Sequence, residues 1–227
     1  MSDASKHIRI NDILLGPLER PALAWLAAHI PAWVTPDTLT VVGFVGSILI
    51  FVSYWLTRLD KNFLWLASLG FLINWFGDSL DGTLARHRKI ERPHYGFFVD
   101  HVIDAVAEIL IFLGIGLSPY VDFRLAAMGL IVYMLVSLLV YIMTISSGFF
   151  RISAGKIGPT EMRAIAILSN AVVYFVGNPL LKLPFGNVAL YNVILGCVII
   201  MLLVIFVIVA WQEAVRLAKV DSKPAPK

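Results

Sequence analysis

The sequence predicts an all-α integral membrane protein: a bundle of six transmembrane helices, preceded by an amphipathic helix at the membrane interface. Hydrophobic residues make up 59% of the 227 residues and charged residues 15%, whereas a soluble domain carries about 25% charged residues. Several uncharged stretches approach or exceed the roughly 20 residues that cross a bilayer as a helix. Soluble, disordered and collagen-like proteins are therefore excluded, and the single cysteine, Cys197, excludes a disulfide-stabilised fold.

Six spans are expected, near residues 37–58, 62–85, 95–118, 124–150, 160–181 and 187–212. Five of them contain long uncharged runs, and turn residues such as Ser118-Pro119 separate several neighbours. The third span differs, because Asp100, Asp104 and Glu108 lie within its apolar sequence. The span count divides the chain into three segments: a cytoplasmic N-terminus with the interfacial helix (1–36), a membrane domain (37–213) and a basic tail (214–227).

The basic residues predict the orientation of the chain. With six spans both termini share one side of the membrane, and 14 of the 18 Lys and Arg residues fall on that side. The other four are Arg58, Lys61, Arg124 and Lys182. Basic loops are retained in the cytoplasm, so both termini are expected there, and the short chain suits the inner membrane of a bacterium. The net charge of +3 is too small to indicate a nucleic-acid partner.

Residues 8–34 predict the interfacial helix. Leucine and tryptophan are mixed there with charged side chains, which is typical of a helix that lies in the plane of the membrane surface. Pro17 and Pro21 are expected to interrupt it, because an internal proline removes a backbone hydrogen bond and clashes with the preceding turn.

Four aspartates lie at or near the ends of apolar spans. Asp78 and Asp81 are spaced i, i+3 near the cytoplasmic end of the second span, and Asp100 and Asp104 are spaced i, i+4 near the start of the third. Each pair shares a helix face, and the connecting loop makes the two helices antiparallel neighbours, so the pairs can meet. Converging carboxylates repel one another unless a cation binds. An all-oxygen site suits Mg²⁺, Mn²⁺ or Ca²⁺ rather than zinc.

Small and basic residues accompany these aspartates. Gly82 directly follows the second aspartate, and Gly96 lies one turn before the third. Glycine lets a backbone or a bulky ligand approach closely, and Ala85 keeps the same face small. Arg86 is placed to contact phosphate from the end of the helix. The combination suggests a metal-bound diphosphate as the ligand.

The whole pattern resembles the signature of the CDP-alcohol phosphotransferase family at every fixed position: Asp78-x2-Asp81-Gly82-x2-Ala85-Arg86-x9-Gly96-x3-Asp100-x3-Asp104. The segment Thr35-Pro36-Asp37-Thr38-Leu39-Thr40 is similar to the stretch that opens the family's first span. Together with the six-span layout, the resemblance extends over most of the chain.

The resemblance implies that an acceptor alcohol attacks the β-phosphate of a CDP-alcohol, with CDP-diacylglycerol as the expected donor, and releases CMP in phospholipid synthesis. It implies that Asp78, Asp81, Asp100 and Asp104 bind Mg²⁺ or Mn²⁺ and that Asp104 accepts the proton. It also implies a homodimer and a set of residues that bind CDP: Asp37, Thr40, Asp78, Gly82, Ala85, Arg86 and Gly96.

Two interpretations of the neighbouring residues stay open. His101 directly follows Asp100, which resembles the choline/ethanolamine phosphotransferase branch, where this histidine is a candidate base and the acceptor is a lipid alcohol. That branch carries glutamate after the glycine, whereas this sequence has Phe97. Glu108, one turn beyond Asp104, is interpreted as a supporting partner of the aspartates or as a buried neutral acid.

A second basic group consists of Arg151, Lys156 and Arg163. It either follows the positive-inside pattern or binds the phosphate of a polar acceptor. The glycerophosphate and inositol phosphate branches carry a basic residue after the fourth aspartate, where this sequence has Ala105. An ion-coupled transporter is the alternative from another class, because intramembrane carboxylates also mark ion pathways. The position of the aspartates at the cytoplasmic ends of adjacent helices favours the transferase.

Overall fold

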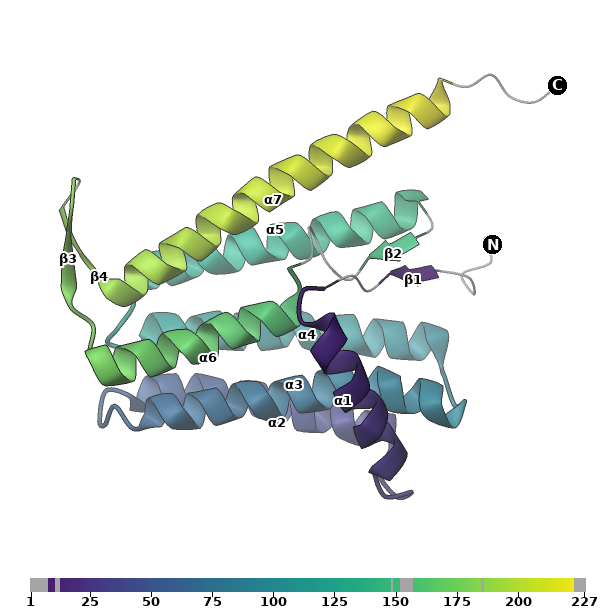
Figure 1. Cartoon of the computed structure of the whole chain (residues 1–227), viewed down its shortest axis with the longest axis horizontal. Coiled ribbons are helices and arrows are strands. Elements are labelled where there is room, and N and C mark those ends of the chain that lie inside the picture. The colour runs from purple at the N-terminus through teal and green to yellow at the C-terminus, as the bar shows by residue number, and fades with distance from the viewer. Residues whose placement is uncertain (1–7, 11–12, 148, 152–156, 185, 223–227) are drawn as a thin grey trace.

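The computed structural model describes residues 8–10, 13–147, 149–151, 157–184 and 186–222. Within these ranges the chain consists mainly of helices, with two small pairs of strands (Figure 1). The helices are α1 (Gly16–His29), α2 (Pro36–Leu56), α3 (Phe63–Arg88), α4 (Pro93–Leu117), α5 (Phe123–Ser147), α6 (Pro159–Val176) and α7 (Leu190–Asp221). The strands are β1 (Ile8–Ile10), parallel to β2 (Phe149–Arg151), and β3 (Leu180–Leu183), antiparallel to β4 (Gly186–Ala189).

The expected all-α architecture is confirmed, and each expected span has a helix. Four of these helices are long and apolar enough to cross a membrane: α2, α3, α5 and α7. α4 has 25 residues and differs from these four because three acidic residues, Asp100, Asp104 and Glu108, lie inside it. α6 has 18 residues and opens with a polar stretch that contains Glu161 and Arg163.

The helix bounds differ from the expected ones most clearly at three places. The interfacial helix expected over residues 8–34 is shorter, because α1 covers only Gly16–His29 and residues 8–10 form β1. α6 ends at Val176 rather than near residue 181, because Gly177 adopts a φ of +83° and Pro179 cannot continue a helix. α7 continues to Asp221, so the basic tail expected from residue 214 begins inside a helix. The sequence pattern does not predict the four strands, because strands of three or four residues are too short to show a periodicity.

α1 is continuous, so the interruption expected at Pro17 and Pro21 is wrong. Pro17 lies in the first turn, where a backbone N–H has no partner within the helix. Pro21 lies one turn later, inside the helix, where it removes a single backbone hydrogen bond. Leu23 is buried on the face that packs against α3, whereas Leu18 and Trp25 are 75% and 61% exposed. This division of faces fits a helix at the membrane interface.

Figure 1 shows the helices after α1 in three layers, α2 with α3, α4 with α6, and α5 with α7, while α1 crosses α3. A buried polar network joins these layers. The hydroxyls of Tyr54 and Tyr191 both donate to Asn170 Oδ1 at 2.8 Å, and Asn170 Nδ2 donates to Ser68 Oγ at 3.2 Å. Because the hydrocarbon core offers no water, such bonds between side chains hold neighbouring helices together.

α2 and α3 cross with their backbones in direct contact. A Cβ atom added at Gly77 would lie 2.2 Å from the backbone nitrogen of Gly43, and one added at Gly46 would lie 2.6 Å from that of Asn74. Only glycine permits so close an approach. Asp78 directly follows Gly77, so this crossing fixes the backbone that carries the first aspartate of the signature.

Candidate active site

The connection between α3 and α4 brings the aspartates of both helices together. α3 ends at Arg88 and is followed by Lys89 in the left-handed conformation, with a φ of 57°. Pro93 opens the first turn of α4, a position that favours proline. The short reversal places the end of α3 beside the start of α4.

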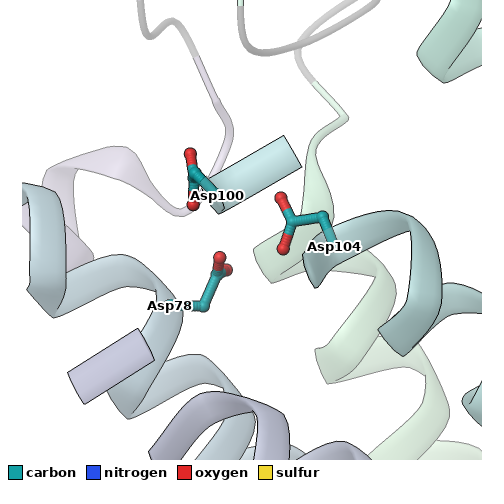
Figure 2. Close-up of side chains that lie close together, drawn as sticks. All are labelled: Asp78, Asp100 and Asp104. Atoms are coloured by element: carbon teal, nitrogen blue, oxygen red, sulfur yellow. The ribbon is translucent and has the colours of Figure 1, made fainter. Parts of the chain in front are cut away.

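Asp78, Asp100 and Asp104 form the acidic cluster of the site. Each contributes a carboxylate oxygen to a group whose members all lie within 4.8 Å of one another. Figure 2 shows the three side chains pointing toward a common centre, Asp78 from α3 and the other two from α4. All three residues are partly buried, so water screens their mutual repulsion only in part.

Asp81, which the sequence analysis placed with these three, is not part of the cluster in the described chain. Its Oδ2 accepts a hydrogen bond of 2.7 Å from Thr40 Oγ1, and the residue is 9% exposed. This contact joins α3 to the start of α2. The assignment of Asp81 as a metal ligand therefore stays a prediction.

Arg163 reaches the cluster from α6. Its Nη2 donates to Asp78 Oδ2 at 2.5 Å, and its Nε donates to Asn74 Oδ1 at 2.7 Å. In one interpretation of the sequence, Arg163 binds the acceptor together with Arg151 and Lys156, and the structure places its guanidinium against the aspartates. Arg151 belongs to β2, where the structure describes the backbone alone, and Lys156 lies outside the described residues.

Asn74 is a residue of the site that the sequence analysis missed. It is 3% exposed, and its Nδ2 donates to the carbonyl of Gly43 and to Ser47 Oγ, each at 3.0 Å. Because its Oδ1 accepts from Arg163, one amide group connects α2, α3 and α6 beside the cluster. The available signal was a polar side chain in an uncharged run, where a buried amide needs partners.

A polar cavity of about 530 Å³ opens beside the cluster. All four aspartates of the signature line it, together with Gly82 and Arg86. In the described chain, four of the residues expected to bind CDP are not among those that line the cavity: Asp37, Thr40, Ala85 and Gly96. Asp37 forms an ion pair with Arg92 instead.

His101, the alternative base, lines the same cavity. Its Nδ1 lies 2.6 Å from the carbonyl oxygen of Phe97 and 3.8 Å from Asp100 Oδ2. A carbonyl oxygen only accepts hydrogen bonds, so Nδ1 carries a proton and donates it. The ring of Phe97 also packs on the imidazole, with 4.0 Å between the ring centroids. His101 is thus held by its own helix at the edge of the cluster.

The donor set of the cluster fits a hard divalent cation. Its members are carboxylates, without histidine or cysteine, and such oxygen ligands suit Mg²⁺ or Mn²⁺. The three carboxylates outnumber the guanidinium that pairs with Asp78, so the cluster keeps a negative charge that a bound cation would offset.

Comparison with known proteins agrees with this chemistry. The sequence model of the CDP-alcohol phosphatidyltransferase family matches residues 33–215, which include α2 to α6 and most of α7. The chain belongs to this family. The resemblance inferred from the spacing of the aspartates is therefore confirmed, and the acidic cluster lies inside the part of the chain that matches the CDP-alcohol phosphatidyltransferase model.

Individual proteins from several organisms are similar in sequence to this chain. The chain is 26% identical over 187 residues to cholinephosphotransferase 1 of Xenopus laevis, a match that covers 77% of this chain and 46% of the relative. It is 30% identical over 165 residues to cholinephosphotransferase 1 of Danio rerio, a match that covers 67% of this chain and 41% of the relative. It is 35% identical over 95 residues to phosphatidylinositol phosphate synthase of Cutibacterium acnes, a match that covers 41% of this chain and 41% of the relative. The chain thus matches less than half the length of each of these three relatives.

Proposed function

We propose that the protein transfers a substituted phosphate from a CDP-alcohol to the hydroxyl of an acceptor alcohol and releases CMP, in phospholipid synthesis. The observation that carries this proposal is the convergence of Asp78, Asp100 and Asp104 from two antiparallel helices beside a polar cavity. The acceptor oxygen forms a bond to the β-phosphorus, and the bond between that phosphorus and the oxygen bridging to CMP breaks. CMP leaves with the bridging oxygen, and the proton of the acceptor hydroxyl passes to a carboxylate.

The residues that line the cavity have different proposed roles in this reaction. Asp78, Asp100 and Asp104 would hold the divalent cation, with Asp81 as a further proposed ligand. When bound, Mg²⁺ or Mn²⁺ supplies positive charge that offsets the diphosphate and the departing CMP. Arg163 keeps the Asp78 carboxylate in position through its hydrogen bond at 2.5 Å.

The proton acceptor is proposed to be Asp104. It lies one turn after Asp100 on the same face of α4, so one carboxylate oxygen can face the cluster while the other faces an incoming hydroxyl. Positioning of the two reacting groups supplies much of the rate in such a step. Arg86 lines the cavity and is proposed to bind a phosphate of CDP. Asp37, Thr40, Gly82, Ala85 and Gly96 complete the proposed nucleotide site.

CDP-diacylglycerol is the first candidate donor. A choline/ethanolamine-type transfer to a lipid alcohol is the second, and the position of His101 supports it, because its imidazole lies 3.8 Å from Asp100 at the cavity wall. The similarity to cholinephosphotransferase 1 from two vertebrates supports the same candidate.

A direct assay tests the proposed reaction. The purified chain in lipid nanodiscs should release CMP from CDP-diacylglycerol or CDP-choline only when an acceptor alcohol and Mg²⁺ or Mn²⁺ are present. EDTA should abolish the release and added Mg²⁺ should restore it, because carboxylate ligands bind hard cations reversibly. Full activity in excess EDTA would contradict the role of the cation.

The proposed setting is a bacterial inner membrane, with six spans, both termini and the active site on the cytoplasmic side, and two chains forming a homodimer. The distribution of basic residues supports the orientation, and the family resemblance supports the dimer. At about 1.5 Å per residue, the 25 residues of α4 are long enough to cross the hydrocarbon core despite their three acidic side chains.

Cysteine labelling in intact cells tests this orientation. In a Cys197→Ser background, Lys61→Cys, between α2 and α3, should react with a membrane-impermeant maleimide added outside. Glu91→Cys, between α3 and α4, should react only after the membrane is opened. The reverse pattern would contradict both the proposed orientation and the proposed cytoplasmic site.

Arg88, at the end of α3, positions the start of α2. Its Nη1 donates to the carbonyl of Val34 at 2.6 Å, and its Nη2 donates to those of Ile30 and Pro31 at 3.1 and 2.9 Å. These bonds hold the connection that leads into Asp37 and Thr40.

Arg88→Ala is therefore expected to raise the KM for the CDP-alcohol by about tenfold, because several hydrogen bonds that orient the nucleotide site are lost, while the KM for the acceptor stays nearly constant. Arg58→Ala is the matched control, since Arg58 Nε donates to the carbonyl of Leu117 at 2.9 Å, away from the site. Steady-state kinetics with each substrate varied in turn measure the difference. An equal rise of both KM values in Arg88→Ala would contradict this role.

A further inference from the structure

Glu108 is an acidic side chain of α4 that the proposed reaction does not use. It lies one turn after Asp104 on the same face of the helix. An ionisable group inside a membrane protein is costly and usually faces a cavity or a partner. Ser137 Oγ donates a long hydrogen bond of 3.5 Å to Glu108 Oε1, and no ion pair reaches Glu108 within the described ranges.

Glu108 lies where two cavities meet. The polar cavity and a smaller, mainly apolar cavity of about 110 Å³ share six lining residues: Asp104, Glu108, Tyr133, Pro159, Met162 and Arg163. Beyond this junction the smaller cavity is lined by apolar side chains such as Ile111, Ala166 and Leu195. A cavity of about 150 Å³ is enough for benzene, so this one has room for a short hydrocarbon segment. A ligand bound beside Asp104 can extend into it.

Arg163 lines both cavities together with Glu108 and carries a further hydrogen-bond donor. Two of its nitrogens donate to Asp78 and Asn74, whereas its Nη1 is buried and has no partner among the described residues. A neutral hydroxyl both donates and accepts, so it can satisfy Glu108 and Nη1 together. A phosphate group can satisfy only the donor, and its charge is repelled by the carboxylates of Glu108 and Asp104.

We infer that Glu108 selects an uncharged acceptor alcohol whose adjoining part is apolar. This inference rests on the proposed function, because it names the acceptor class of that transfer. The acceptor hydroxyl binds by donating to Glu108 and accepting from Arg163 Nη1, and the small cavity takes the neighbouring hydrocarbon. When the oxygen attacks phosphorus, the hydroxyl turns its proton toward Asp104, one helix turn away. A lipid alcohol has this chemistry, and a sugar or glycerol phosphate does not.

The test measures CMP release by the full chain in nanodiscs, with CDP-choline and CDP-diacylglycerol tried in turn as donors. The acceptors are 1,2-dioctanoylglycerol and glycerol 3-phosphate, and wild type should prefer the first. Glu108→Leu should raise the KM for dioctanoylglycerol by about tenfold, since the hydrogen bond to the acceptor hydroxyl is lost, and change the donor KM less than about twofold. Glu108→Gln keeps an accepting oxygen, so this KM should rise less, while discrimination against glycerol 3-phosphate should weaken.

Two further comparisons separate recognition from general damage. Ala166→Leu narrows the small cavity and should raise the same KM, whereas Val172→Leu, on the 40% exposed outer side of α6, should not. Glu91→Gln, in the exposed connection before α4, is the charge control. An unchanged acceptor KM in Glu108→Gln and Ala166→Leu would overturn the inference. So would activity of wild type with glycerol 3-phosphate but not with dioctanoylglycerol. Absence of CMP release with every acceptor would instead overturn the proposed function and the inference together.

Discussion

Asp100→Asn and Asp104→Asn are each expected to lower the turnover number by about a hundredfold to a thousandfold. The substitution keeps the shape of the side chain but removes an anionic ligand from the cluster, and the loss of a single stabilising group at a reacting centre commonly costs about 10²–10³-fold. Asp78→Asn should be equally inactive, but it also leaves the Arg163 guanidinium without its acidic partner. The two aspartates of α4 therefore give the cleaner test.

Asp221→Asn is the matched control, because Asp221 is exposed at the end of α7. CMP release under saturating substrates and Mg²⁺ measures the effect, and melting temperatures establish that each variant is folded. His101→Ala should keep a measurable fraction of the wild-type rate, since its imidazole lies at the edge of the cluster. A His101→Ala variant as inactive as Asp104→Asn would assign the proton to the histidine instead.

Gly77→Ala is expected to destabilise the protein by about 3 kcal/mol or more, which is the upper range for overpacking of a core. The added methyl group would lie 2.2 Å from the nitrogen and 2.5 Å from the Cα of Gly43. These are backbone atoms, so no change of rotamer can relieve the contact and the two helices must separate. For a chain of this size, such a loss corresponds to a fall of roughly 10 °C in Tm.

Gly196→Ala in α7 is the control, because nothing lies within 4 Å of a Cβ atom at that position. Its Tm should stay the same or rise slightly, since alanine is favoured over glycine inside a helix by about 1 kcal/mol. Thermal unfolding in one detergent, followed by size-exclusion chromatography, compares the two variants. Equal Tm changes in Gly77→Ala and Gly196→Ala would contradict the close crossing of α2 and α3.

The sequence predicts the helices of this fold well because each is an apolar run bounded by turn residues. It places Asp78, Asp100 and Asp104 together correctly, since helical spacing and a short reversal suffice for that step. The position of Asp81 could not be predicted from helical spacing alone. Its i, i+3 spacing from Asp78 allows both side chains to face α4, but its carboxylate bonds to Thr40 of α2. That choice depends on how closely two helices cross, which local spacing does not determine.

The contacts of Arg163 could not be predicted for a similar reason. The residue meets Asp78 across 85 positions of sequence, and the positive-inside pattern explains its presence equally well without any contact. Asn74 carried a usable signal as a buried amide, but its partners lie on two other helices. Arg88 likewise reads as one basic residue of a cytoplasmic loop, although four backbone carbonyls accept from it.

The closely packed pair of α2 and α3 depends less on the bilayer than α5 and α7 do. In their most apolar windows, 39% of α2 and 44% of α3 are buried inside the protein, against 17% for α5 and for α7. Lipid therefore supplies much of the packing around α5 and α7, and a bilayer of unsuitable thickness acts first on such helices. The side of the polar cavity that α3 forms with Asp78 should therefore keep its structure in detergent. The side that α5 forms with Tyr133 and Ser137 should need lipid to do so.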